Sequence, residues 1–199
     1  MLDLRGRSRI APILDPIAVG LAKARLTPTM VTIVGLVVTL VGAALIAVDR
    51  YALGAFIAGV GAVLDALDGP LARHLGTASI RGAFVDTMAD RFGEVGLWAG
   101  LTFSLRTDET GLMLCVTALA FSLLTPYVRS KAESWGAEGR GGWMGRAERM
   151  ILLLVGLIVI DLWLKSALHP LLWVFVVLSG LTIAQRIRRT WQQLGDDDA

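Results

Sequence analysis

The chain has 199 residues, of which 55% are hydrophobic, and its formal net charge is only +2. A mean hydropathy of +0.65 is too high for an ordinary soluble domain. A single cysteine, Cys115, excludes a disulfide framework and a thiolate metal site. We therefore expect one integral membrane domain over residues 1–199, with no second domain.

The N-terminal segment, residues 1–25, is predicted to form an amphipathic helix that lies in the membrane interface. Its apolar positions recur at a spacing of three or four between basic flanks. They are Ile10, Ile13, Leu14, Ile17, Ala18 and Leu21. A soluble partner helix is the alternative for this segment. The first apolar run starts near residue 29, too late and too long for a cleavable signal peptide.

Six apolar stretches follow, at about 29–48, 51–67, 83–104, 110–128, 150–164 and 168–185. Each is near the roughly 20 residues that a helix needs to cross a bilayer core of about 30 Å. Pro28 precedes the first stretch, where a proline suits the start of a helix. The prediction is an all-α integral membrane protein with a six-helix bundle over residues 26–189 and a solvated tail over 190–199.

The basic residues predict the orientation of this bundle. Most of the 19 Lys and Arg residues fall in segments on the same side as the two termini. They are Arg5, Arg7, Arg9, Lys23, Arg25, Arg73, Arg81, Arg129, Lys131, Arg140, Arg146, Arg149, Arg186, Arg188 and Arg189. By the positive-inside rule, we expect a multi-pass protein of the cell membrane with both termini and the loop after the second span in the cytoplasm.

Four aspartates interrupt the apolar sequence between the second and third stretches. Asp65 and Asp68 are three residues apart, Asp86 and Asp90 are four apart, and each spacing puts a pair on one helical face. The short connection over residues 70–82 lets the two faces meet near the cytoplasmic interface. Four unpaired carboxylates in a bilayer would cost on the order of 10 kcal/mol, so we expect them to line a wet or cation-filled cavity.

Oxygen ligands without His or Cys favour Mg²⁺ or Mn²⁺ over zinc, and two such ions bridged by carboxylates suit displacement at phosphorus. Gly69 lets the backbone approach a bulky substrate, and Arg73 is placed to bind a phosphate, although a simple topological charge is its alternative. Arg91, next to Asp90, is expected to form an internal ion pair, with a catalytic task as the alternative. Glu94, one turn after Asp90, is a candidate supporting partner.

The complete run from Asp65 to Asp90, D-x2-D-G-x2-A-R-x8-G-x3-D-x3-D, resembles the signature of the CDP-alcohol phosphotransferases. The resemblance extends in outline to the whole chain, including residues 26–32 before the first span. It implies an enzyme that moves a substituted phosphate from a CDP-linked donor to an alcohol and releases CMP.

Carried over by position, the resemblance makes Asp65, Asp68 and Asp86 the ligands of one metal ion, and Asp65, Asp86 and Asp90 those of a second. Asp90 would also be the general base for the attacking hydroxyl. The implied contacts to the CDP-lipid are Pro28, Thr29, Met30, Val31, Gly69, Arg73 and Ser79. Many members of the family have Asn where this chain has Thr29.

Four cations near the mouth of the expected cavity are candidates for binding a phosphorylated acceptor. They are Arg129, Lys131, Arg146 and Arg149. Positive-inside bias is the alternative explanation for them. The segments 126–136 and 145–149 resemble those of the actinobacterial phosphatidylinositol phosphate synthases, whose acceptor is inositol phosphate. Gly145 stands where those enzymes often have Glu, and Lys131 where Arg is frequent.

The predicted activity is transfer of a phosphatidyl group from CDP-diacylglycerol to a phosphorylated alcohol, with inositol phosphate as the favoured acceptor and two Mg²⁺ or Mn²⁺ ions per active site. Glycerol phosphate is the alternative acceptor. A cation- or proton-coupled carrier is a remote alternative, because a carrier needs charges along a path to both faces. Here the outer halves of the spans are nearly uncharged, with Asp161 as the exception. We expect membrane lipids and a second copy of the chain as partners, and no nucleic acid.

Overall fold

The computed structural model describes residues 14–196, except Arg140 and Lys165, and every element in this part of the chain is helical. Residues 14–23 form a first helical segment. The helices that follow are α2 (Pro28–Ala47), α3 (Tyr51–Asp65), α4 (Asp68–His74), α5 (Ile80–Ser104), α6 (Glu109–Ser134), α7 (Arg146–Leu162) and α8 (Leu168–Asp196). The expected all-α class is confirmed.

Four segments are long and apolar enough to cross a membrane: α2, the α3–α4 segment Tyr51–His74, α6, and Leu168–Gly195 of α8. Helix α7 has 17 residues, slightly fewer than the roughly 20 that a span usually needs. Helix α5 has 25 residues, but its first half carries charged side chains that lower its hydropathy. The described part of the chain therefore has four candidate membrane spans, as expected of a membrane-embedded protein.

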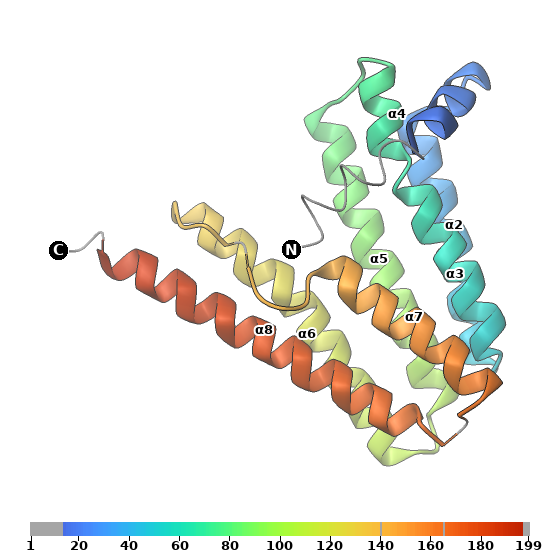
Figure 1. Ribbon diagram of the computed structural model, residues 1–199, viewed down its shortest axis with the longest axis vertical. Helices are drawn as coiled ribbons and strands as arrows, with labels where there is room; N and C mark the ends of the chain where they lie inside the picture. Colours follow the sequence, from blue (N-terminus) through green and yellow to red (C-terminus); the bar gives the residue numbers. More distant parts are fainter. Residues whose placement is uncertain (1–13, 140, 165, 197–199) are drawn as a thin grey trace.

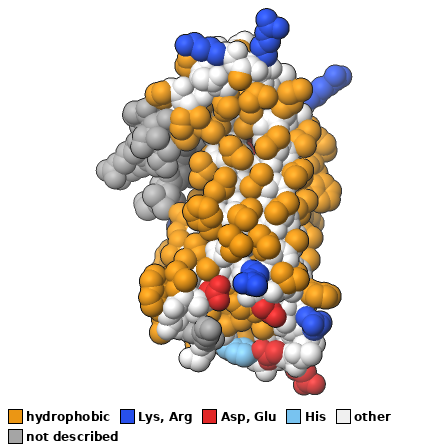
Figure 2. Space-filling view, turned by 90° about the vertical axis from the view of Figure 1, so that its right-hand side faces the viewer, with side chains coloured by type: hydrophobic (Ala, Val, Ile, Leu, Met, Phe, Trp, Pro, Cys, Tyr) orange, Lys and Arg blue, Asp and Glu red, His pale blue; other side chains and the backbone are white. Residues whose placement is uncertain are grey.

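The surface agrees with this assignment. On the face shown in Figure 2, hydrophobic side chains cover the middle of the molecule and charged side chains gather at its two ends. Exposed apolar residues such as Val37 on α2 and Phe56 on α3, at 53% and 63% exposed, would be unfavourable in water. In a bilayer these side chains face lipid instead.

Helices α2, α3 and α5 pack closely through small residues. A Cβ atom at Gly42 would lie 2.6 Å from the carbonyl oxygen of Gly54 on α3, so the two backbones touch directly. Helix α5 approaches α2 in the same way, with Gly100 against the main chain of Ala43. This packing holds α3 and α5, which carry three of the four aspartates, against adjoining faces of α2.

The helices converge at one end of the molecule and diverge at the other (Figure 1). Near the converging end, Trp98 of α5 and Phe175 of α8 meet edge to face, with ring centroids 4.7 Å apart, in an apolar core that also contains Leu157 of α7. Toward the other end, α6 and α8 run together away from α2, α3 and α5, and α7 lies between the two groups. The helix axes are therefore farthest apart toward the end of the bundle that carries α4.

Buried polar contacts join α6, α8 and the loop before α7. Arg186 of α8 donates from Nε to the Gly141 carbonyl at 2.9 Å and from Nη1 to the Thr125 carbonyl at 2.8 Å. The Met144 amide donates to the Thr182 hydroxyl at 3.1 Å. These bonds fix the loop that ends at α7 and thereby help to place the first turn of that helix.

Helix α8 continues to Asp196, so most of the expected tail over residues 190–199 is helical. In the N-terminal segment, Ala18 packs with Val31, Leu67 and Leu71 in a small apolar cluster at the α4 end. The residues before 14 and after 196 lie outside the described part of the chain.

Candidate active site

Two aspartates lie at the break between α3 and α4. Asp65 is the last residue of α3 and Asp68 is the first of α4, where a negative charge interacts favourably with the helix dipole. Leu67 in this turn and Leu71 one turn into α4 are buried and pack with Val31 of α2. The Thr32 hydroxyl of α2 donates to Asp68 Oδ2 at 2.6 Å. Thr32 belongs to the segment 26–32 that suggested the family, but its spacing alone did not connect it with Asp68.

Asp86 reaches the same place from α5. Ser79 caps this helix, because its hydroxyl accepts from the Gly82 amide at 3.1 Å, and Asp86 follows one turn after Gly82. One carboxylate oxygen from each of Asp65, Asp68 and Asp86 lies within 4.8 Å of the other two, and all three residues are partly buried. Three carboxylates this close repel one another strongly, and an all-oxygen set fits Mg²⁺ or Mn²⁺.

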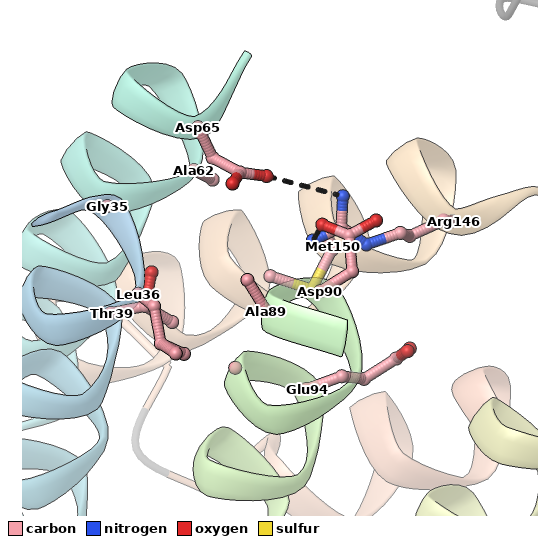
Figure 3. Close-up of a pocket in the computed structure, with 11 residues that line it drawn as sticks. Gly35, Leu36, Thr39, Ala62, Asp65, Ala89, Asp90, Glu94, Arg146 and Met150 are labelled. Carbon is pink, nitrogen blue, oxygen red and sulfur yellow. Dashed lines mark ion pairs between the residues drawn. The ribbon is translucent and has the colours of Figure 1, made fainter. Parts of the chain in front are cut away.

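Asp90, one turn further along α5, faces a cation. Its Oδ1 lies 2.5 Å from Nη2 of Arg146, the first residue of α7. Nη1 of Arg146 lies 4.0 Å from Asp65 Oδ2, so this guanidinium lies between the two carboxylates (Figure 3). The structure thus gathers three of the four aspartates in one cluster and sets the fourth beside it, against Arg146.

These side chains line a small cavity between α2, α3, α5 and α7. Its walls are formed by Gly35, Leu36, Thr39, Ala62, Asp65, Ala89, Asp90, Gly93, Glu94, Arg146 and Met150. Figure 3 shows Asp65 and Asp90 pointing toward Arg146 from two different helices, with Glu94 one turn below Asp90. The cavity therefore has acidic groups on its α3 and α5 walls and a cation on its α7 wall.

Glu94, which helps to line the cavity, forms a buried ion-pair network on its α5 side. Its Oε2 lies 2.7 Å from Arg91 Nη1 and its Oε1 lies 3.1 Å from Arg149 Nη2, while the side chains of Glu94 and Arg149 are only 1% and 2% exposed. The internal ion pair expected for Arg91 is confirmed. Arg149 reaches the neighbourhood of the aspartates, but as the buried partner of Glu94.

The other two cations expected at the acceptor site lie elsewhere. Arg129 pairs with Glu133 on its own helix at 2.9 Å. Lys131 Nζ lies 4.7 Å from the ring centre of Trp135, in an apolar groove between α6 and α8. The structure therefore brings Arg146 and Arg149 to the aspartates, and not Arg129 or Lys131. The sequence did not predict the buried contacts of Arg186, whose side chain is only 9% exposed. The only indication in the sequence is a charged residue within the last long helix.

The residues expected to contact the CDP-lipid share one end of the bundle. Thr27 caps α2, which begins at Pro28, so Thr29 and Met30 are exposed on its first turn and Val31 is buried. Gly69 and Arg73 share a face of α4, because a Cβ at Gly69 would lie 3.5 Å from Arg73 Nη1. Ser79 lies at the start of α5. Together with the three clustered aspartates, these positions form one region around the α4 end.

Residues 25–180 match the CDP-alcohol phosphatidyltransferase family. The chain belongs to this family. Membership confirms the expectation of a transferase of substituted phosphate groups and disfavours a carrier. It also agrees with the geometry, in which carboxylates and cations from several helices meet at one end of an otherwise apolar bundle.

The relatives of this CDP-alcohol phosphatidyltransferase include phosphatidylinositol phosphate synthases. That of Mycobacterium tuberculosis is 32% identical over 206 residues, covering 99% of this chain and 94% of the relative. Its crystal structure with CDP-DAG bound matches with a TM-score of 0.84 and 32% identity, over 90% of this chain and 94% of that one. The structure with manganese and citrate also gives 0.84, with 31% identity over 89% and 88%. The resemblance to actinobacterial enzymes is confirmed.

Proposed function

We propose that this protein transfers the phosphatidyl group of CDP-diacylglycerol to inositol phosphate and releases CMP. The observation that carries the proposal is the cluster of Asp65, Asp68 and Asp86, with Arg146 directly beside it. A metal-binding set next to an arginine suits the joining of a pyrophosphate donor to a phosphorylated acceptor. The full-length similarity to phosphatidylinositol phosphate synthases supports inositol phosphate as that acceptor.

The aspartates are proposed to hold two divalent cations. Asp65, Asp68 and Asp86 would bind one Mg²⁺ or Mn²⁺, and Asp65, Asp86 and Asp90 the second. Bound there, the ions neutralise the pyrophosphate and stabilise charge on the departing CMP. The oxygen-only donors of this chain support the assignment, as does the manganese-bound structure of the relative.

The donor is proposed to lie at the α4 end. Gly69 leaves room for the nucleotide and Arg73 binds a donor phosphate, with Ser79 beside them at the start of α5. The first turn of α2, residues 28–31, would contact the same lipid. These proposed contacts to the CDP-lipid lie on α2, α4 and the start of α5, and none of them comes from α7.

Asp90 is proposed to accept the proton of the attacking hydroxyl, and Arg146 to hold the acceptor phosphate. Asp90 can serve as a base if the hydroxyl proton becomes acidic late in the transfer. Arg149, one turn behind Arg146 and paired with Glu94, would support that cation from within the protein. Arg129 and Lys131, whose contacts are with Glu133 and Trp135, would act only through their positive charge at longer range.

Six spans are proposed for the bundle, with α5 and α7 crossing the membrane beside the four more apolar segments. The charged half of α5 faces the cavity and α7 needs only a slightly thinned bilayer. The α4 end and both termini would then be cytoplasmic, with residues 1–25 in the interface. A homodimer is expected as well.

Purified protein in lipid, supplied with CDP-diacylglycerol and Mg²⁺, tests the proposal. CMP release is measured with inositol phosphate, glycerol phosphate, inositol and serine in parallel. We expect inositol phosphate to give the highest kcat/KM. Preference for glycerol phosphate would replace the proposed acceptor, and absence of CMP release with all four would contradict the proposed reaction.

A further inference from the structure

Two ion pairs, one turn apart, connect α5 with α7. Asp90 and Glu94 share one face of α5, and Arg146 and Arg149 share one face of α7. The upper pair, Asp90–Arg146, is 2.5 Å apart, and the lower pair, Glu94–Arg149, is 3.1 Å apart. The same two helices are therefore joined twice, by Asp90–Arg146 and by Glu94–Arg149. Figure 3 shows the first of these junctions, where Asp90 faces Arg146.

The two pairs differ in burial. The side chains of Arg146 and Asp90 are 37% and 16% exposed, whereas those of Arg149 and Glu94 are 2% and 1% exposed. The upper guanidinium can therefore contact a ligand that enters the cavity. The lower one is enclosed by protein, and loss of its partner would leave a buried charge without compensation. The lower pair suits a fixed support for the upper one.

Glu94 uses both carboxylate oxygens, and each binds a different arginine. Oε1 binds Arg149 across the helix interface and Oε2 binds Arg91 at 2.7 Å. Arg91 in turn places Nη2 at 3.9 Å from Asp90 Oδ2. Glu94 thus holds the arginine behind Arg146 and the arginine beside Asp90. A glutamine could accept from only one of them, because its amide group would face the second guanidinium.

Helix α6 supports Arg149 from another side. The Ser122 carbonyl lies 3.5 Å from Arg149 Nη2. Pro126, four residues later, has no N–H to bind that carbonyl within the helix, so it remains available to the arginine. Arg149 is therefore held between a carboxylate of α5 and a main-chain oxygen of α6.

We propose that Glu94 is a positioning residue for the phosphorylated acceptor. By holding Arg149 and Arg91, Glu94 fixes the first turn of α7 against α5, so that Arg146 faces the acceptor phosphate and Asp90 faces its hydroxyl. This inference rests on the proposed function. It assigns Glu94 no contact with substrate or metal, and it predicts an effect on the acceptor rather than on the donor, whose surface does not include α7.

Glu94→Gln tests this role in purified protein. We expect the KM for inositol phosphate to rise at least about tenfold, because a displacement of ~1 Å in a positioning residue can cost up to about 10²-fold. The KM for CDP-diacylglycerol and the affinity for Mn²⁺, followed by electron paramagnetic resonance, should stay close to wild type. The matched control is Asp161→Ala, which removes a carboxylate at the other end of α7 and should leave both KM values unchanged.

Glu94→Asp and a double-mutant cycle with Arg149→Met complete the test. Glu94→Asp keeps the charge, so its KM for inositol phosphate should lie between those of wild type and Glu94→Gln. If Glu94→Gln does not fold, Glu94→Asp is compared with wild type instead. The double variant should be no worse than Arg149→Met. Equal rises in both KM values, or additive effects in the cycle, would overturn the positioning role. If the wild-type protein were active with glycerol phosphate only, that result would contradict the proposed acceptor and not the positioning role. The same variants would then be assayed with glycerol phosphate.

Discussion

The two ends of the bundle use carboxylates in opposite ways. At the α4 end, the carboxylates of Asp65, Asp68 and Asp86, which belong to three different helices, lie close to one another. At the converging end, Asp161 Oδ2 accepts from the Ala52 amide at 2.8 Å, and Asp108 accepts from the Gly111 amide at 3.1 Å. The second pattern satisfies the exposed donors at helix starts and stabilises the fold. The first brings like charges together, which is favourable only when a cation is bound.

Helix α7 takes part in both patterns. Its first residue, Arg146, crosses to the aspartates, whereas Asp161 near its last turn closes the start of α3. Helix α7 therefore connects the candidate active site at its first turn with a helix-capping contact near its last turn. Both ends carry charged side chains, so the presence of charge does not distinguish them. The partner of each charge does, because Arg146 faces a carboxylate of the aspartate site and Asp161 faces a main-chain amide.

Metal removal should have the largest effect at the α4 end. Chelation with EDTA is expected to abolish CMP release, and added Mg²⁺ or Mn²⁺ should restore it, because the three clustered carboxylates need cations to bind a pyrophosphate. Mn²⁺ binding followed by electron paramagnetic resonance should be lost in Asp86→Asn and kept in Asp108→Asn. Full activity in EDTA would mean that the cluster does not act through metal.

Asp90→Asn should lower kcat by about 10²–10⁴-fold, the usual contribution of a general base. The variant should still bind CDP-diacylglycerol, since the donor surface is otherwise unchanged, and this is measured by retention of labelled lipid. An active Asp90→Asn enzyme would remove Asp90 as the base.

Arg146→Ala should raise the KM for inositol phosphate by about 10–100-fold, because a hydrogen bond to a charged group contributes about 1.5–3 kcal/mol. The KM for CDP-diacylglycerol should change little. Arg106→Ala is the matched control, since Arg106 lies at the converging end against Phe103. If both KM values rose equally, Arg146 would not be specific for the acceptor.

Asp161→Ala should have the smallest effect and only on stability. Loss of its bond to the Ala52 amide is expected to cost about 1 kcal/mol, by analogy with other helix caps. Thermal unfolding in detergent measures this, and steady-state kinetics on the same sample should match wild type. A kinetic effect as large as that of Arg146→Ala would remove the distinction between the two ends of α7.

The spacing of the aspartates predicted most of the metal site. Separations of three and four residues place each pair on one helical face. Because the connection between α3 and α5 is short, the two faces are expected to lie close together. The ion pair of Arg91 with Glu94 was accessible for the same reason, because its partners are one turn apart on α5. These features depend only on local helical geometry.

The contacts of the cations could not be predicted from local helical geometry. Arg129 and Lys131 are near Arg146 in sequence, yet they belong to α6, which diverges from the aspartate-bearing helices together with α8. Arg186 lies 61 residues beyond Thr125, which binds it, and Glu94 lies 55 residues before Arg149. The sequence by itself determined the apolar helices, their faces and the acidic cluster. Only the tertiary structure decided which cations meet that cluster, because partners on separate helices depend on the angle and rotation at which those helices pack.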